Sequence, residues 1–143
     1  MVRGSKNYRK QNTKVSRLHE KIANQRKDWI ENLSTKLATE YDIVCVEDIN
    51  LQNISQCLSL GKSTNDNGFG YFRERLKTKL QERGKLFVVI DKWYPSSKTC
   101  RFCGTVNKNL KLSDRVWVCE CGKEINRDHN AAINILNYGL NLI

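Results

Sequence analysis

Four cysteines near the C-terminus constrain this chain more than any other feature. They form two close pairs, Cys100-x2-Cys103 and Cys119-x-Cys121, with fifteen residues between the pairs and a glycine after each. Glycine allows the tight turn that directs both thiolates of a pair at one cation. Two such turns predict a closed tetrahedral sulfur site, the geometry of structural zinc, and residues 105–118 have room for the hairpin of a zinc ribbon. The alternatives are two redox-active cysteine pairs or an accidental cluster. The second pair also departs from the common Cys-x2-Cys spacing, because it is one residue shorter.

The composition favours a cytoplasmic chain that binds a polyanion. Lys and Arg number 25 and Asp and Glu 15, so the net charge is +10, which points to nucleic acid. The apolar runs at 43–46 and 86–90 fall far short of the roughly 20 residues that span a bilayer. No apolar stretch follows the basic N-terminus, which argues against a signal peptide. We therefore expect no membrane partner and reduced cysteines, with Cys45 and Cys57 as packed or loop thiols.

Hydrophobic periodicity predicts an α/β fold. A flexible basic arm over 1–14 precedes an amphipathic helix over 15–40, whose apolar stripe is expected to be core. The short, apolar runs 43–47 and 86–90 predict strands buried on both faces. Between them, residues 70–83 predict a second amphipathic helix. This order of elements predicts a parallel strand pair with a crossover helix.

Glu47 and the adjacent Asp48 stand where an α/β protein can keep a site. Glu47 ends the first predicted strand, in an acidic island between two basic segments. Carboxylates at that end of a strand can hold a divalent cation against a phosphate backbone. Asp128 and Asn126 precede an apolar helical pattern, so either one can cap that helix. The alternatives are an acidic residue that leaves the core for solvent and an ordinary helix cap.

Several short stretches together resemble one protein family. They are Glu47-Asp48-Ile49-Asn50, then YPSSKTCRFCG at 94–104, then the shorter cysteine turn, then RDHNAAINIL at 127–136. In this order they resemble the C-terminal part of TnpB, the transposon-encoded OrfB "transposase" that is related to the type V CRISPR effector nucleases. The resemblance implies a partial RNase H-like (RuvC-type) domain, with a zinc ribbon inserted before its last active-site helix. It also implies an RNA-guided DNA endonuclease that uses Mg²⁺.

The resemblance assigns roles to individual residues. A site of this kind holds two divalent cations roughly 4 Å apart among three carboxylates. Glu47 matches the second carboxylate of the family and Asp128 the third, while Asn126 stands where the family usually has another Asp. The residues expected to contact nucleic acid are one arginine beside Asp128 and three lysines: Arg127, Lys98, Lys10 and Lys14.

One family motif has no match in this sequence. The first active-site Asp of the family lies in a Gly-x-Asp-x-Gly setting after a strand, whereas the one aspartate of residues 1–40, Asp28, lies within a predicted helix. Three strands of the family sheet would then be missing, which leaves the strand at 43–47 with an unpaired edge. Two carboxylates would leave the metals short of ligands. We therefore expect an N-terminally truncated member that does not cut DNA by itself.

This interpretation divides the chain into a basic arm (1–14), a partial RuvC core (15–99), a zinc ribbon (100–122) and the C-terminal helix of the core (123–143). Three functions stay open. The chain is part of a TnpB-type nuclease completed by a separate N-terminal fragment, a non-catalytic ribbon that binds DNA or RNA, or an inert remnant of a transposon gene. The implied partners are DNA and guide RNA, the implied metals are Zn and Mg, and the implied location is the prokaryotic cytoplasm.

Overall fold

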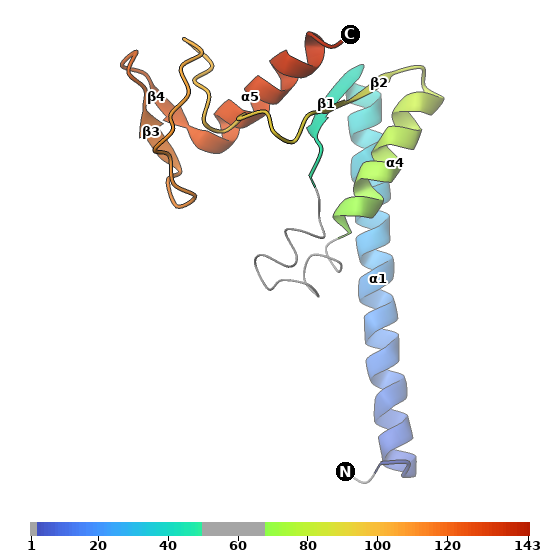
Figure 1. Cartoon of the computed structure of the whole chain (residues 1–143). Helices are drawn as coiled ribbons and strands as arrows, with labels where there is room; N and C mark the ends of the chain where they lie inside the picture. The colour runs from blue at the N-terminus through green and yellow to red at the C-terminus, as the bar shows by residue number, and fades with distance from the viewer. Residues whose placement is uncertain (1–2, 50–67) are drawn as a thin grey trace. The chain divides into compact units, whose positions relative to one another are not determined.

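A computed structural model of the chain describes residues 3–49 and 68–143. These residues belong to two compact units, shown in Figure 1, and each unit is described by itself. The first unit takes in Met1–Tyr41 and Leu51–Gly84, and the second takes in Asp42–Asn50 and Lys85–Ile143. No helix among the described residues is long and apolar enough to cross a membrane.

The first unit is built on one long helix, α1 (Lys6–Glu40). It begins well before the expected start at Val15, because the Ser5 hydroxyl caps it by accepting a hydrogen bond from the Tyr8 backbone N–H at 3.2 Å. The many lysines and arginines that follow are good helix formers. The expected flexible arm over 1–14 is therefore wrong from the start of α1 onward, whereas the predicted end of the helix is confirmed.

Helix α4 (Phe69–Glu82) packs along the C-terminal half of α1, as Figure 1 shows. Ile30, Ser34 and Ala38 recur every four residues on α1 and are buried, as is Leu80 of α4. Helix α4 is roughly 21 Å long, whereas α1 is roughly 52 Å long. The apolar stripe of α1 is therefore core only from Ile30 onward, and four residues predicted to be core are about half exposed or more: Val15, Leu18, Ile22 and Trp29.

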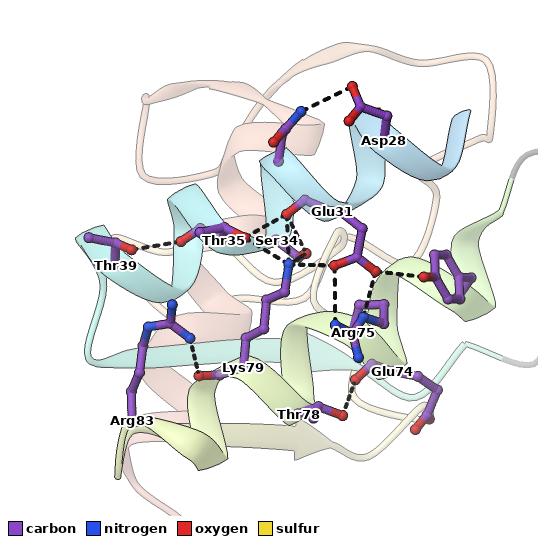
Figure 2. Close-up of polar contacts among 12 residues, drawn as sticks. Asp28, Glu31, Ser34, Thr35, Thr39, Glu74, Arg75, Thr78, Lys79 and Arg83 are labelled. Atoms are coloured by element: carbon purple, nitrogen blue, oxygen red, sulfur yellow. Dashed lines mark hydrogen bonds and ion pairs between the residues drawn. The ribbon is translucent and has the colours of Figure 1, made fainter. Parts of the chain in front are cut away.

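A buried lysine joins the two helices (Figure 2). The ammonium of Lys79 on α4 forms an ion pair with Glu31 of α1 at 2.7 Å, and Lys79 is only 8% exposed. Arg75 Nε and the Tyr71 hydroxyl donate to the same carboxylate, each at 2.6 Å. The Lys79 ammonium also donates to three further oxygens of α1, which are Glu31 O at 2.7 Å, Ser34 Oγ at 3.0 Å and Thr35 Oγ1 at 2.7 Å. A buried charge that needs this many partners favours one register of α4 on α1.

These contacts make the stability of the first unit depend on pH. The Arg75 guanidinium, together with Lys79 and Tyr71, lowers the pKa of Glu31 to about 2, against about 4.3 in an unfolded chain. A lowered carboxyl pKa stabilises the fold above the unfolded value, and this stabilisation is lost as the pH falls from about 4.3 towards 2. We expect Glu31→Gln to lower the urea midpoint at neutral pH and to remove this part of the acid dependence, as measured by helical circular dichroism. Glu20→Gln, exposed on α1, is the control, and parallel acid profiles for the unsubstituted chain and Glu31→Gln would contradict the prediction.

The second unit contains the predicted parallel strand pair. β1 (Ile43–Glu47) and β2 (Leu86–Ile90) have the expected bounds, and their register runs from Ile43 opposite Leu86 to Glu47 opposite Ile90. The expectation of burial on both faces is wrong, because every residue of β1 is half-buried and Leu86 and Val89 are exposed. Among the described residues this sheet has two strands, and helix α5 (Arg127–Leu140) packs against it.

Helix α5 approaches β1 at Gly139, which is buried. A Cβ at this position would lie 2.5 Å from Cys45 Sγ and 2.9 Å from Cys45 Cβ. Beside it on α5, the Tyr138 ring stacks on Tyr94, with ring centroids 4.4 Å apart. The missing side chain of Gly139 therefore allows the helix backbone to contact the strand, and Cys45 is a packed thiol as expected. Cys57 lies outside the described residues.

This close contact predicts an unusual outcome for a glycine in a helix. Gly139→Ala would ordinarily stabilise a helix by about 1 kcal/mol. Here the clash with Cys45 dominates, and we expect a net loss of about 1–3 kcal/mol in the free energy of unfolding, measured by urea denaturation. Asn137→Ala, exposed on the same helix, should be neutral, and adding Cys45→Ala to Gly139→Ala should recover part of the loss. A stabilised Gly139→Ala variant would show that the predicted contact is absent.

The cysteines lie in a ribbon whose strands differ from the expectation. β3 (Val116–Val118) and β4 (Glu124–Asn126) form an antiparallel hairpin around the second cysteine pair, and a bridge between Thr99 and Val106 flanks the first pair. The expected hairpin within 105–118 is therefore wrong. The paired segments flank each cysteine pair, and they do not form a hairpin in the stretch that separates the two cysteine pairs. The ribbon also continues past the expected limit at residue 122. Its buried core is small and consists of Cys100, Trp117, Cys119 and Ile125, with Leu110 packed against them.

Candidate functional site

The four predicted cysteine ligands come together. Their sulfur atoms all lie within 4.8 Å of one another, and none forms a disulfide. The Cys100 and Cys121 sulfurs are 3.8 Å apart, and those of Cys103 and Cys119 are 3.5 Å apart. Four sulfurs at about 2.3 Å from a zinc ion would be separated by roughly 3.8 Å. The cluster therefore has the ligand type and spacing to hold one tetrahedral metal ion.

The backbone holds the first cysteine of each pair in the same way. The Cys100 carbonyl accepts from Gly104 N–H at 2.9 Å, and its N–H donates to the Thr105 carbonyl at 2.9 Å. The second turn repeats this pattern with each partner one residue closer: the Cys119 carbonyl accepts from Gly122 N–H at 2.8 Å, and its N–H donates to the Lys123 carbonyl at 2.9 Å. Both glycines have positive φ, 76° and 78°. The second turn is thus one residue shorter than the first but keeps the same pattern of backbone hydrogen bonds.

The thiols of the cluster do not ionise alike. Hydrogen bonding with Thr105, whose Oγ1 lies 3.4 Å from Sγ, lowers the pKa of Cys103 to about 6. The backbone N–H of Cys121 lowers the pKa of Cys119, but burial and the neighbouring thiols outweigh it and raise that pKa to about 12. Crowded thiols thus oppose further ionisation of one another. A bound divalent cation would remove this opposition, because metal binding displaces the thiol protons.

Asp128 lies in the first turn of α5 and does not cap the helix. Asn126 is the cap, since its Oδ1 accepts a hydrogen bond from His129 N–H at 3.0 Å. The Asp128 side chain is 67% exposed and pairs with two arginines, with Arg115 Nη1 at 3.1 Å and Arg127 Nε at 3.3 Å. Of the two capping residues that the sequence allowed, the structure therefore selects Asn126. The carboxylate of Asp128 stays available to a cation that can compete with the arginines.

Glu47 ends β1 in the same unit, opposite Ile90. It is half-buried, and burial raises the pKa of its carboxyl group. Within residues 3–49 and 68–143, only the four cysteines form a group of three or more His, Cys, Asp or Glu side chains close enough to share a metal. The described residues therefore do not surround Glu47 or Asp128 with a complete carboxylate set.

The residues expected to bind nucleic acid are divided between the two units. Lys10 and Lys14 are exposed on α1 of the first unit. Lys98 is exposed just before the first cysteine pair in the second unit. Arg127 is mostly covered, at 14% exposure, and donates to the Leu112 carbonyl at 2.5 Å as well as to Asp128. Arg127 is thus bound to the ribbon, whereas the three lysines are open to a phosphate backbone.

Comparison with known proteins identifies the family. The family described as "Probable transposase" matches residues 1–58, and the family described as "Cas12f1-like, TNB domain" matches residues 69–135. A Streptomyces pristinaespiralis protein named "Putative RNA-guided DNA endonuclease" is 41% identical over 139 residues, which are 97% of this chain and 35% of that protein. The "TnpB-like protein L79" of Acanthamoeba polyphaga mimivirus is 32% identical over 143 residues, which are 95% of this chain and 27% of that protein. This chain belongs to the TnpB (OrfB) family.

The TnpB match covers nearly all of this chain, but the chain spans only about a third of the length of the curated relatives it matches. A solved structure, the "Cryo-EM structure of the Cas12f1-sgRNA-target DNA complex", shares its fold with a TM-score of 0.65 at 24% identity. The match covers 86% of this chain and 36% of that one. Together with the Cas12f1-like TNB match, this likeness confirms the expected fold class, a partial RNase H-like (RuvC-type) α/β domain with an inserted cysteine ribbon.

Two features of the TnpB site were missed by reasoning from sequence. Arg115, which pairs with Asp128, could have been found from strand register, since pairing the hairpin around the second cysteine turn places residue 115 beside residue 127. Asn130 and Asn134, within the last TnpB motif, are buried and donate to carbonyl groups just before Cys100. Their four-residue spacing on a predicted helix was the available signal.

Proposed function

We propose that this chain supplies two carboxylates and the metal-binding ribbon of a TnpB-type RNA-guided DNA endonuclease. The observation that carries the proposal is the start of α5. The last TnpB motif follows the ribbon strand β4 directly, and Asn126 takes the capping role that Asp128 could have filled. Asp128 is left exposed for a cation, and Glu47 at the end of β1 is the second carboxylate.

We assign zinc to the cysteine cluster, as a structural ion. Thiolate ligands suit zinc, and four of them leave no coordination position open for a substrate or a water molecule. This ion therefore takes no part in the reaction, and its contribution is to hold the ribbon that leads into α5.

We assign Mg²⁺ to Glu47 and Asp128, together with a third carboxylate from another segment or polypeptide. When bound, Mg²⁺ stabilises charge on the attacking and leaving oxygens of a phosphodiester. The residues of this chain hold and orient the carboxylates. Arg115 pairs with Asp128 at 3.1 Å. A cation held by Asp128 would compete with this pair, and an Arg115 guanidinium freed in this way would be able to contact a phosphate oxygen.

A reconstitution experiment tests this function. The 143-residue chain is assayed for cleavage of a target plasmid in Mg²⁺, alone and with a separate polypeptide carrying the remaining residues of the Streptomyces relative and the RNA that guides it. We expect no cleavage by the chain alone and EDTA-sensitive cleavage by the two polypeptides together. Cleavage by the chain alone would refute the need for a third carboxylate. No cleavage by the pair, with nucleic-acid binding retained, would favour the non-catalytic binding module.

The basic face of α1 predicts a salt-dependent affinity for nucleic acid. Lys10 and Lys14 are exposed and follow one another at four-residue spacing. Replacing both with Ala should weaken binding to a 20-nucleotide DNA or RNA, and should reduce the slope of log K against log salt by about 1–2. The control is Lys36→Ala, on the same helix but within 3.9 Å of Glu40. An unchanged salt slope in the double variant would exclude these lysines from the interface.

A further inference from the structure

A side chain of α5 holds the backbone on both sides of a predicted metal ligand. Asn130 is 1% exposed. Its Nδ2 donates to the Thr99 carbonyl at 2.7 Å, and its Oδ1 accepts from Arg101 N–H at 3.1 Å. These two groups belong to the peptide bonds immediately before and after Cys100. Asn130 therefore pairs with Cys100 as a neighbouring strand would, but from a helix.

Asn134, one helical turn further on, strengthens the same attachment. It is 4% exposed, and its Nδ2 donates to the Ser96 carbonyl at 2.8 Å and to the Thr99 carbonyl at 2.7 Å. The Thr99 carbonyl thus accepts from both asparagines, which uses both of its lone pairs. The segment that leads into the first cysteine turn is therefore bound to the buried face of α5.

We infer that Asn130 is a positioning residue that couples metal binding at the cysteine cluster to the order of the first turns of α5. Asp128, the nuclease carboxylate of the proposed function, lies in those turns, two residues before Asn130. The inference rests on the cluster holding a metal, as proposed above. The side chain of Asn130 restricts the backbone from which the Cys100 sulfur projects, so it favours the ligand geometry before the metal arrives.

The coupling works in both directions. Groups that hold a metal ligand in place commonly change metal affinity by 10–100-fold when they are replaced. Any factor that Asn130 adds to metal affinity is, by linkage, a factor that the bound metal adds to the attachment of α5. The ribbon ion therefore acts on the helix that carries Asp128 without contacting it.

The test measures the affinity of the full chain for Co²⁺, followed by its thiolate charge-transfer absorption in the presence of a competing chelator. We expect Asn130→Ala to weaken Co²⁺ binding by 10–100-fold, because it frees the Arg101 N–H after Cys100 and removes one of the two donors to the Thr99 carbonyl before Cys100. Asn134→Ala leaves the Arg101 contact in place and should cost only a few-fold. Asn137→Ala, exposed on the same helix, is the matched control and should leave the affinity unchanged.

A second variant separates positioning from loss of stability. Gly139→Ala should destabilise the same unit at the far end of α5 while leaving the contacts of Cys100 intact. At an equal loss of urea stability we expect it to weaken Co²⁺ binding far less than Asn130→Ala does. Hydrogen exchange should also show that Co²⁺ protects the amides of residues 128–133 in the unsubstituted chain, and protects them less in Asn130→Ala.

The outcomes distinguish the two proposals. If the unsubstituted chain binds Co²⁺ and Asn130→Ala binds it equally well, the positioning role is overturned while the metal centre stands. If Gly139→Ala lowers the affinity as much as Asn130→Ala, the effect is one of stability, and the inference fails. If the unsubstituted chain shows no thiolate–Co²⁺ absorption, both the proposed metal centre and the coupling are refuted.

Discussion

Removing the metal from the cysteine cluster should unfold the ribbon and leave the helical unit of α1 and α4 folded. Two of the four buried residues in the ribbon core, Cys100 and Cys119, are themselves predicted ligands. Without a metal, Trp117 and Ile125 keep too little apolar surface to offset the entropy of ordering the ribbon. Structural zinc sites contribute roughly 10–16 kcal/mol in small zinc-binding domains, so this is the largest effect on stability that we expect.

The measurement follows the three tryptophan indole signals by NMR during chelation, together with the metal content of each variant. The Trp117 signal should collapse to the shift of an unfolded chain, while that of Trp29 on α1 should stay. Cys103→Ser should reproduce the apo spectrum, and Cys45→Ala, outside the cluster, should retain one equivalent of metal. A ribbon that keeps its protected amides after chelation would show that the small apolar core is sufficient.

In the reconstituted nuclease, Asp128→Asn and Glu47→Gln should each reduce DNA cleavage by at least roughly 10²–10³-fold. Each substitution removes a negative charge that the proposed Mg²⁺ site needs but retains the shape of the side chain. Asp128 does not cap α5, so its loss should leave the helix intact. Glu124→Gln, exposed on β4, is the control for a change of charge close to the same helix.

DNA binding by the same assemblies separates catalysis from recognition. We expect both carboxylate variants to bind target DNA at least as well as the unsubstituted assembly, because they remove negative charge. Retained cleavage in Asp128→Asn would show that Asp128 is not an active-site residue. Cleavage and DNA binding lost together would instead indicate that the variant fails to assemble.

The sequence predicted the elements with a strong local signal and failed where an element depends on its neighbours. The strands at 43–47 and 86–90 have the predicted bounds because short β-branched runs are distinctive. Their burial was overestimated, since burial depends on how many strands and helices cover them. The helix begins earlier than the predicted residue 15, because Ser5 caps it and the lysines and arginines that follow are good helix formers, although basic residues without an acidic partner also suit a flexible arm.

The candidate site shows the same division. The spacing of the four cysteines predicts their cluster, which the structure contains. The sequence alone did not decide between Asn126 and Asp128 as the helix cap, because both residue types cap helices well. The roles of Asn130 and Arg115 depend on contacts between segments 13 to 31 residues apart, and these follow from tertiary packing rather than from local pattern.

Strand β4 passes into α5 without a linker, because Asn126 is both the last residue of the strand and the cap of the helix. No residue separates the strand from the helix, so the junction cannot accommodate an extra residue without moving one of them. Insertions between residues 124 and 130 would shift Asp128 relative to the ribbon, whereas the exposed Lys108 and Asn109 can accept additional residues. Length variation among relatives of this chain should therefore gather in the loop before β3 and be absent from the junction.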